Sequence, residues 1–160
     1  MSHAACYVHG MSTADFYCYG PDGRLALIVE ARARTATTNT AWAAQVRQER
    51  LAESPADQQA AFAIVTLEAL YVWDAGAPAD RVADYEASLG SEDFRSAFGA
   101  YLERAGITAS SRVDDQVLEL VVAWWLDDIA AGAYAASPFM LDTGVPQLVG
   151  GGRVEQRTAA

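Results

Sequence analysis

The chain has 160 residues, of which 52% are hydrophobic and 20% charged, so it suits one globular domain over residues 1–160 with a real core. No apolar run approaches the ~20 residues of a membrane-spanning helix. The N-terminus also lacks the basic and apolar regions of a signal peptide, so we expect a cytoplasmic protein with no membrane partner. The formal net charge of −10 argues against a nucleic-acid-binding protein of the usual basic kind.

The charge is distributed unevenly along the chain. Residues 1–52 contain five arginines and four acids, whereas the remainder contains six arginines and seventeen acids. All 11 basic residues are arginine, and the sequence contains no lysine. The acidity therefore lies in the later two-thirds of the chain, and the early arginines remain candidate contacts for phosphate groups.

Residues 1–14 are a short lead-in of mixed composition. His3, Cys6 and His9 recur at intervals of three, with Cys18 after them, which raises the alternative of a zinc site. Structural zinc sites usually combine two close ligand pairs separated by a longer loop, so we favour ordinary side chains here. Two cysteines do not make a disulfide framework.

Residues 15–32 predict a β-hairpin. The first arm, residues 15–19, alternates acidic, aromatic and small side chains, and the second arm, residues 24–32, is largely apolar. Gly20-Pro21-Asp22-Gly23 between them has the composition of a tight turn. We expect the two arms to pair as antiparallel strands.

The later chain predicts helices and strands in alternation. Thr40 is a candidate N-cap for the first helix, and Ser91 and Asp114 are candidate N-caps for two later ones. The expected elements are a helix at residues 40–53, strands at 61–67 and 69–73, helices at 91–105 and 114–131, and a loop-rich tail at 137–160 with at most one short strand or helical turn. This order predicts an α/β (α+β) fold in which helices flank a mixed central β-sheet.

The ends of the hairpin carry the candidate chemistry. Asp15 opens one arm and Glu30 closes the other, so pairing brings them side by side. Side chains alternate along a strand, and Glu30 and Arg32 therefore share a face. Two carboxylates and a cation at one strand end are typical of a divalent-metal site for phosphodiester hydrolysis. The alternatives are a strand-start aspartate and a simple ion pair at the rim of the sheet.

These residues resemble the PD-(D/E)xK signature of restriction-endonuclease-like nucleases, with Asp15 followed by Glu30-Ala31-Arg32. The resemblance continues in order along the chain and extends to a group of small uncharacterised bacterial proteins with that fold. The further matching segments are residues 42–47, 62–73, 116–126 and 151–155. The resemblance implies a restriction-endonuclease-like fold over nearly all the chain from Asp15 onwards.

The resemblance also implies roles for particular residues. Asp15, Glu30 and the backbone carbonyl of Ala31 would bind Mg²⁺ or Mn²⁺, which would activate the attacking water. Arg32 stands where the superfamily usually has lysine; it remains protonated and would stabilise charge on the phosphate. Gln45 matches a glutamine that one branch of the superfamily places beside the site. The candidate nucleic-acid contacts are Arg34, Arg47 and Arg50.

Two classes of function follow. In the first, the protein is a metal-dependent nuclease that uses Asp15, Glu30, Arg32 and Gln45 as its catalytic residues. In the second, it is a catalytically inactive relative that serves as an interaction or regulatory module. The acidic residues 74–93 and the glycine-rich tail are candidate contacts for a protein partner or a second copy of the chain.

Overall fold

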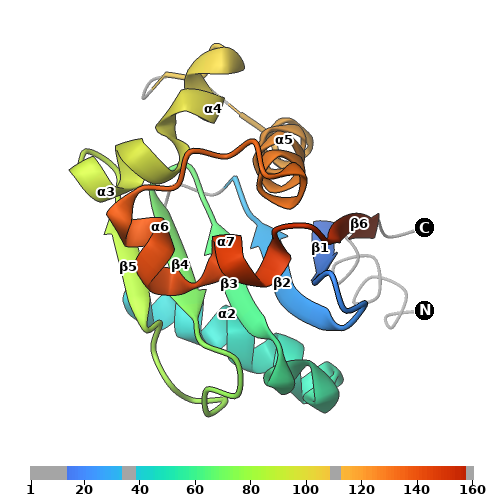
Figure 1. Ribbon diagram of the computed structural model, residues 1–160. Coiled ribbons are helices and arrows are strands. Elements are labelled where there is room, and N and C mark those ends of the chain that lie inside the picture. Colours follow the sequence, from blue (N-terminus) through green and yellow to red (C-terminus); the bar gives the residue numbers. More distant parts are fainter. Residues whose placement is uncertain (1–13, 34–38, 109–112, 158–160) are drawn as a thin grey trace, which may run out of the picture.

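A computed structural model describes residues 14–33, 39–108 and 113–157 of the chain. The described chain forms one six-stranded sheet with helices packed on both faces (Figure 1). The strands are β1 (Ala14–Tyr19), β2 (Leu25–Ala31), β3 (Ala61–Val65), β4 (Ala69–Trp73), β5 (Tyr85–Ser88) and β6 (Arg153–Arg157). The helical segments are α2 (Thr40–Glu53), η1 (Pro55–Gln59), α3 (Glu92–Phe94), η2 (Arg95–Gly99), α4 (Ala100–Arg104), α5 (Asp115–Ala131), α6 (Pro138–Thr143) and α7 (Val145–Val149).

The sheet is mixed, and its strand order is β5-β4-β3-β2-β1-β6. β1 and β2 form the predicted antiparallel hairpin, whose turn contains Gly23 at φ 84°. β2 and β3 run parallel because α2 carries the chain back between them. All other neighbouring strands are antiparallel. The predicted class, a mixed central sheet flanked by helices in an α/β (α+β) fold, is confirmed.

Two clusters of buried hydrophobic residues lie on opposite faces of the sheet. The α5-side cluster packs the sheet against α3 through α7 and includes Phe16, Val29, Phe98, Val122, Trp125 and Leu126. The α2-side cluster packs the sheet against α2 and includes Ile28, Ala43, Val46, Phe62, Tyr71 and Trp73. Strands β3 and β4 are buried at every position, as expected for central strands covered on both faces.

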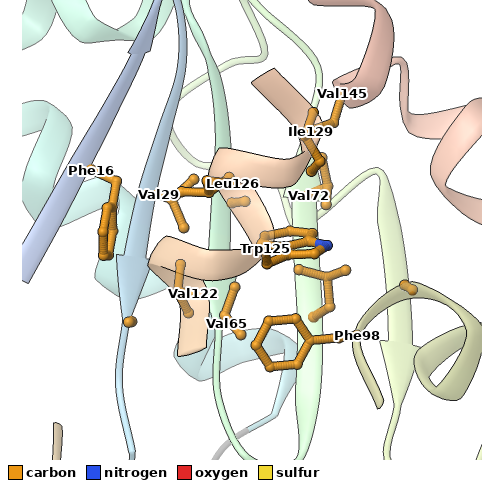
Figure 2. Packing of buried hydrophobic residues seen from close by; sticks show 14 of the residues in the cluster. Phe16, Val29, Val65, Val72, Phe98, Val122, Trp125, Leu126, Ile129 and Val145 are labelled. Carbon is orange, nitrogen blue, oxygen red and sulfur yellow. The ribbon is translucent and has the colours of Figure 1, made fainter. Parts of the chain in front are cut away.

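Trp125 lies at the middle of the α5-side cluster. Figure 2 shows its ring among Val65, Val72 and Phe98, with Val122 and Leu126 from the same helix beside it. The Trp125 and Phe98 rings meet edge to face, with centroids 5.3 Å apart and an interplanar angle of 88°. This contact joins α5 to η2, so one aromatic pair fixes two helical segments over the sheet.

Some segments differ from the sequence predictions. The helix expected over residues 91–105 is divided by the π-helical turn η2 into α3, η2 and α4. The tail expected as loop-rich forms α6, α7 and β6, and β5 was not predicted. Asn39, not Thr40, caps α2, because its Oδ1 accepts the N–H of Trp42 at 2.8 Å. Thr40 instead donates its hydroxyl to Glu86 at 2.7 Å.

Within the described ranges, no helix has the length and apolar character needed to cross a membrane.

Candidate functional site

The hairpin brings the two predicted acids into register. Asp15 on β1 is directly paired with Glu30 on β2, and the neighbouring pair is Phe16 with Val29. Residues paired in this way share a face of the sheet. Glu30 follows Ile28 by two residues, and Ile28 belongs to the α2-side cluster, so this is the face that α2 covers. The side chain of Asp15 and all of Arg34 lie outside the described residues.

Glu30 is buried between two arginines, and only 2% of its side chain is exposed. Its Oε1 accepts a hydrogen bond from a terminal guanidinium nitrogen of Arg32 at 3.0 Å. Its Oε2 accepts one from Nε of Arg50, also at 3.0 Å. The side chains of Arg32 and Arg50 are 25% and 18% exposed, so both arginines are more accessible than the carboxylate that they pair with. We call Glu30, Arg32 and Arg50 the Glu30 triad.

Three elements hold the Glu30 triad in place. Glu30 lies near the end of β2, one residue before the buried Ala31, which pairs with Val65 on β3. Arg32 follows the strand, and its backbone N–H donates to the Val65 carbonyl at 2.9 Å. Arg50 comes from the last turn of α2, on the side of the helix that faces the sheet. The triad therefore requires the hairpin, the parallel pairing of β2 with β3, and the docking of α2.

The chemistry of the Glu30 triad differs from that of an open metal site. A buried carboxylate is tolerated when paired and hydrogen-bonded cations offset its desolvation, and the two arginines do this. Each oxygen keeps further lone-pair capacity. A divalent ion there would, however, lie beside two guanidiniums already at hydrogen-bond distance. Among the residues that the structure describes, no group of three or more His, Cys, Asp or Glu side chains could hold a metal ion. Of the two carboxylates expected to bind magnesium, Glu30 is thus already paired with two cations, and the side chain of Asp15 lies outside the described residues.

Gln45 is not part of this site. It is exposed on the outer side of α2, where its side-chain amide donates to Glu49 at 3.3 Å. Five residues separate it from Arg50, which places the two roughly 140° apart around the helix. The interpretation of Gln45 as a residue beside Glu30 is wrong, because α2 docks with a different face toward the sheet.

Arg47 is also not an exposed nucleic-acid contact, because its side chain is fully buried. Its two terminal nitrogens donate to the backbone carbonyls of Pro78 and Ala77 at 2.9 and 2.8 Å. Its guanidinium carbon lies 5.4 Å from the centroid of the Trp73 ring. Desolvation by burial lowers the pKa of Arg47 from its ordinary value. This arginine holds the loop after β4 against α2 and offers no charge to a ligand.

Sequence reasoning placed Arg50 among phosphate contacts and missed its pairing with Glu30. A signal was present in the helix pattern. Val46 is apolar and lies four residues before Arg50, so the two share one face of α2, and in the structure this face meets the sheet. The identity of the partner on the sheet could not be read from that spacing.

The site thus consists of a paired Asp15 and Glu30 at the end of a hairpin, with both oxygens of Glu30 held by arginines. Comparison with known proteins adds no relative to this description. No protein-family model, no curated protein and no solved structure matches the chain.

Proposed function

We propose that this protein is a catalytically silent domain of the restriction-endonuclease-like kind, and that it works as an interaction or regulatory module. One observation supports this above the others. Both carboxylate oxygens of Glu30 accept hydrogen bonds from guanidiniums at 3.0 Å, and the side chain is 2% exposed. A carboxylate in this state serves as the centre of a structural ion pair.

The energetics favour this assignment over metal binding. Mg²⁺ requires near-ideal octahedral geometry and usually keeps several of its waters. To admit a hydrated ion, Glu30 would have to lose at least one arginine, and breaking a buried pair costs about 3–5 kcal/mol. The released guanidinium would then remain close to the ion and repel it. Only a high intrinsic affinity for metal would overcome both terms.

A metal-dependent nuclease remains the second candidate, and the strand register favours it. Asp15 and Glu30 are directly paired, and the guanidinium of Arg32 already contacts Glu30 at 3.0 Å. In this alternative, Asp15, Glu30 and the Ala31 carbonyl would hold Mg²⁺ or Mn²⁺. Arg32 would stabilise negative charge on the phosphate but, being permanently protonated, would not act as a base.

A metal titration followed by thermal melting separates the two candidates. An ion at 100 times its Kd stabilises the folded state by about 2.7 kcal/mol. For a chain of this size, that would raise the Tm by roughly 5–10 °C. We expect no such rise for the wild-type protein with Mg²⁺ or Mn²⁺. A rise that disappears in Glu30→Gln but persists in Glu92→Gln would overturn the proposal, because Glu92 is an exposed acid in a different part of the fold and serves as the control.

A direct assay tests hydrolysis itself. Supercoiled plasmid is incubated with the protein and Mn²⁺, and nicking is followed on a gel. We expect no nicking above the buffer control. Nicking by the wild type that Asp15→Asn and Glu30→Gln both abolish, while Glu92→Gln retains it, would establish the second candidate.

A further inference from the structure

Strand β6 forms an edge of the sheet. It pairs with β1 over all five of its residues, from Asp15 with Arg157 to Tyr19 with Arg153, without a shift in register. No described strand lies on its other side. An edge strand offers a row of backbone N–H and C=O groups to any extended chain that approaches it. The outer side of β6 is thus a candidate for pairing with a partner strand.

Proteins usually guard such an edge with proline, a bulge, a short strand or charged side chains. β6 has no proline, and its pairing with β1 has no bulge. Its charged side chains turn inward over β1. The guanidinium of Arg153 lies 4.1 Å from the centroid of the Tyr19 ring, and that of Arg157 lies 4.0 Å from the centroid of Tyr17. Both arginines therefore lean toward β1, and their side chains do not extend across the outer backbone of β6.

Glu155 fixes this arrangement. One of its oxygens lies 3.0 Å from Nε of Arg157, and the other lies 3.7 Å from a terminal nitrogen of Arg153. Both arginines nevertheless remain more than half exposed. They lie on the same face of the strand, whereas Val154 packs partly against the α5-side cluster on the opposite face. Two exposed cations therefore flank the outer edge of β6 on one face of the sheet.

The local charge differs from that of the rest of the chain. The strand ends around β6 and the Glu30 triad bring together four arginines and three acids, namely Arg32, Arg50, Arg153 and Arg157 with Asp15, Glu30 and Glu155. This leaves seven arginines and 18 acids elsewhere in the sequence. The other edge strand, β5, contains Glu86 and follows Asp84. An acidic segment would therefore meet like charge at β5 but two exposed arginines against one glutamate at β6.

We propose that the outer edge of β6 binds an extended, acidic segment of a partner protein, which adds to the sheet as a further strand beside Arg153–Arg157. Backbone hydrogen bonds would supply affinity, and acidic side chains at alternate positions would meet Arg153 and Arg157. This inference rests on the proposed role as an interaction module and names its partner class. A second copy of the chain fits less well, because full overlap of two antiparallel β6 strands places Glu155 opposite Glu155 and Arg153 opposite Arg157.

The test uses the full chain and a short fluorescein-labelled peptide in which glutamate alternates with valine, followed by fluorescence anisotropy. We expect this peptide to bind at least about tenfold more tightly than one in which lysine replaces glutamate. The double variant Arg153→Glu, Arg157→Glu should lose about tenfold in affinity. The matched control, Arg81→Glu with Arg95→Glu, changes the net charge equally at two exposed arginines on other elements and should bind as the wild type does.

Hydrogen exchange locates the binding. Amides of residues 153–157 should gain protection when the peptide is added, and those of β5 should not. Equal affinity for both peptides, equal losses in the two double variants, or protection confined to other elements would each overturn the proposal. So would a stable dimer in light scattering that Arg153→Glu dissociates, or displacement of the peptide by oligodeoxythymidine, since the edge would then serve another partner.

These outcomes are separable from those for Glu30. A metal-dependent rise in Tm would overturn the silent-domain proposal whether or not the peptide binds. Failure of the peptide to bind, with no metal response, would remove only the β6 inference. Melting curves of each variant, measured alongside, show that a loss of binding is not a loss of folding.

Discussion

Twenty residues of sequence separate Glu30 from Arg50, yet Oε2 of the first lies 3.0 Å from Nε of the second. The contact joins the end of β2 to the last turn of α2 across the parallel β2–α2–β3 crossover. It gives the buried carboxylate a second cation, since Arg32 already occupies the other oxygen. This pairing converts a candidate metal ligand into a link between helix and sheet.

Loss of Arg50 should therefore destabilise the fold. We expect Arg50→Met to lower the free energy of unfolding by about 3 kcal/mol, because Glu30 would stay buried with one cation fewer. Chemical denaturation measures the change. Arg95→Met is the control: its pair with Glu92 is 3.6 Å long and exposed, and we expect a change within about 0.5 kcal/mol. Adding Glu30→Gln should reduce the cost of Arg50→Met, and similar costs for both arginines would contradict the triad.

Arg47 makes a second prediction about α2. Arg47→Met keeps most of the side-chain volume but removes the donors to the carbonyls of Ala77 and Pro78. We expect a loss of about 2–3 kcal/mol in unfolding free energy, because Arg47 is fully buried and its charge-assisted hydrogen bonds would be lost. Gln48→Met, at the neighbouring exposed position, should change stability little. An unfolding free energy that Arg47→Met leaves unchanged would contradict the structural role of the buried guanidinium.

The start of α2 supplies a third prediction. Asn39→Ala should cost about 1 kcal/mol, because the N–H of Trp42 loses its capping oxygen. Thr40→Ala removes only an exposed hydrogen bond to Glu86 and should cost less than about 0.5 kcal/mol. Thermal or urea denaturation of both variants compares the two positions. A larger loss of stability in Thr40→Ala than in Asn39→Ala would instead show that Thr40 caps the helix.

Cys18 predicts a dependence on pH. Burial, and to a lesser degree the charge of Asp127, raises the pKa of its thiol from 9.0 to about 12. A raised pKa in the folded state means that the stabilising contribution is complete below pH 9 and is lost as pH rises toward 12. The difference in unfolding free energy between wild type and Cys18→Ala should narrow over that range.

The same burial predicts low reactivity of Cys18. In a Cys6→Ser background, iodoacetamide at pH 8 should label the folded chain far more slowly than the unfolded chain, since the thiolate is the reactive form. Mass spectrometry gives the labelled fraction over time. Equal rates in folded and unfolded protein would show that Cys18 is accessible.

The hairpin was predictable because its information is local. Gly20-Pro21-Asp22-Gly23 specifies a turn, and alternation specifies the faces. A register shift between Cys18 and Tyr19, which neither pattern indicates, then aligns Asp15 with Glu30. The terminal strand β6 was harder to predict. Its five residues are mostly polar. It forms because β1 offers a backbone partner and because the guanidiniums of Arg157 and Arg153 stack over the rings of Tyr17 and Tyr19. Strand propensity alone does not identify such a segment.

Local patterns were thus sufficient for the mixed class of the fold, the hairpin, and the shared face of Glu30 and Arg32, whereas the exact pairing of Asp15 with Glu30 also needed the register shift between Cys18 and Tyr19. The burial and the partners of the α2 side chains could not be predicted from those patterns. Arg47 became buried, Arg50 joined Glu30, and Gln45 turned outward when α2 docked on the sheet. The rotation of a helix about its axis is set by how its face packs on strands distant in sequence, and short-range periodicity narrows that rotation without naming the partners.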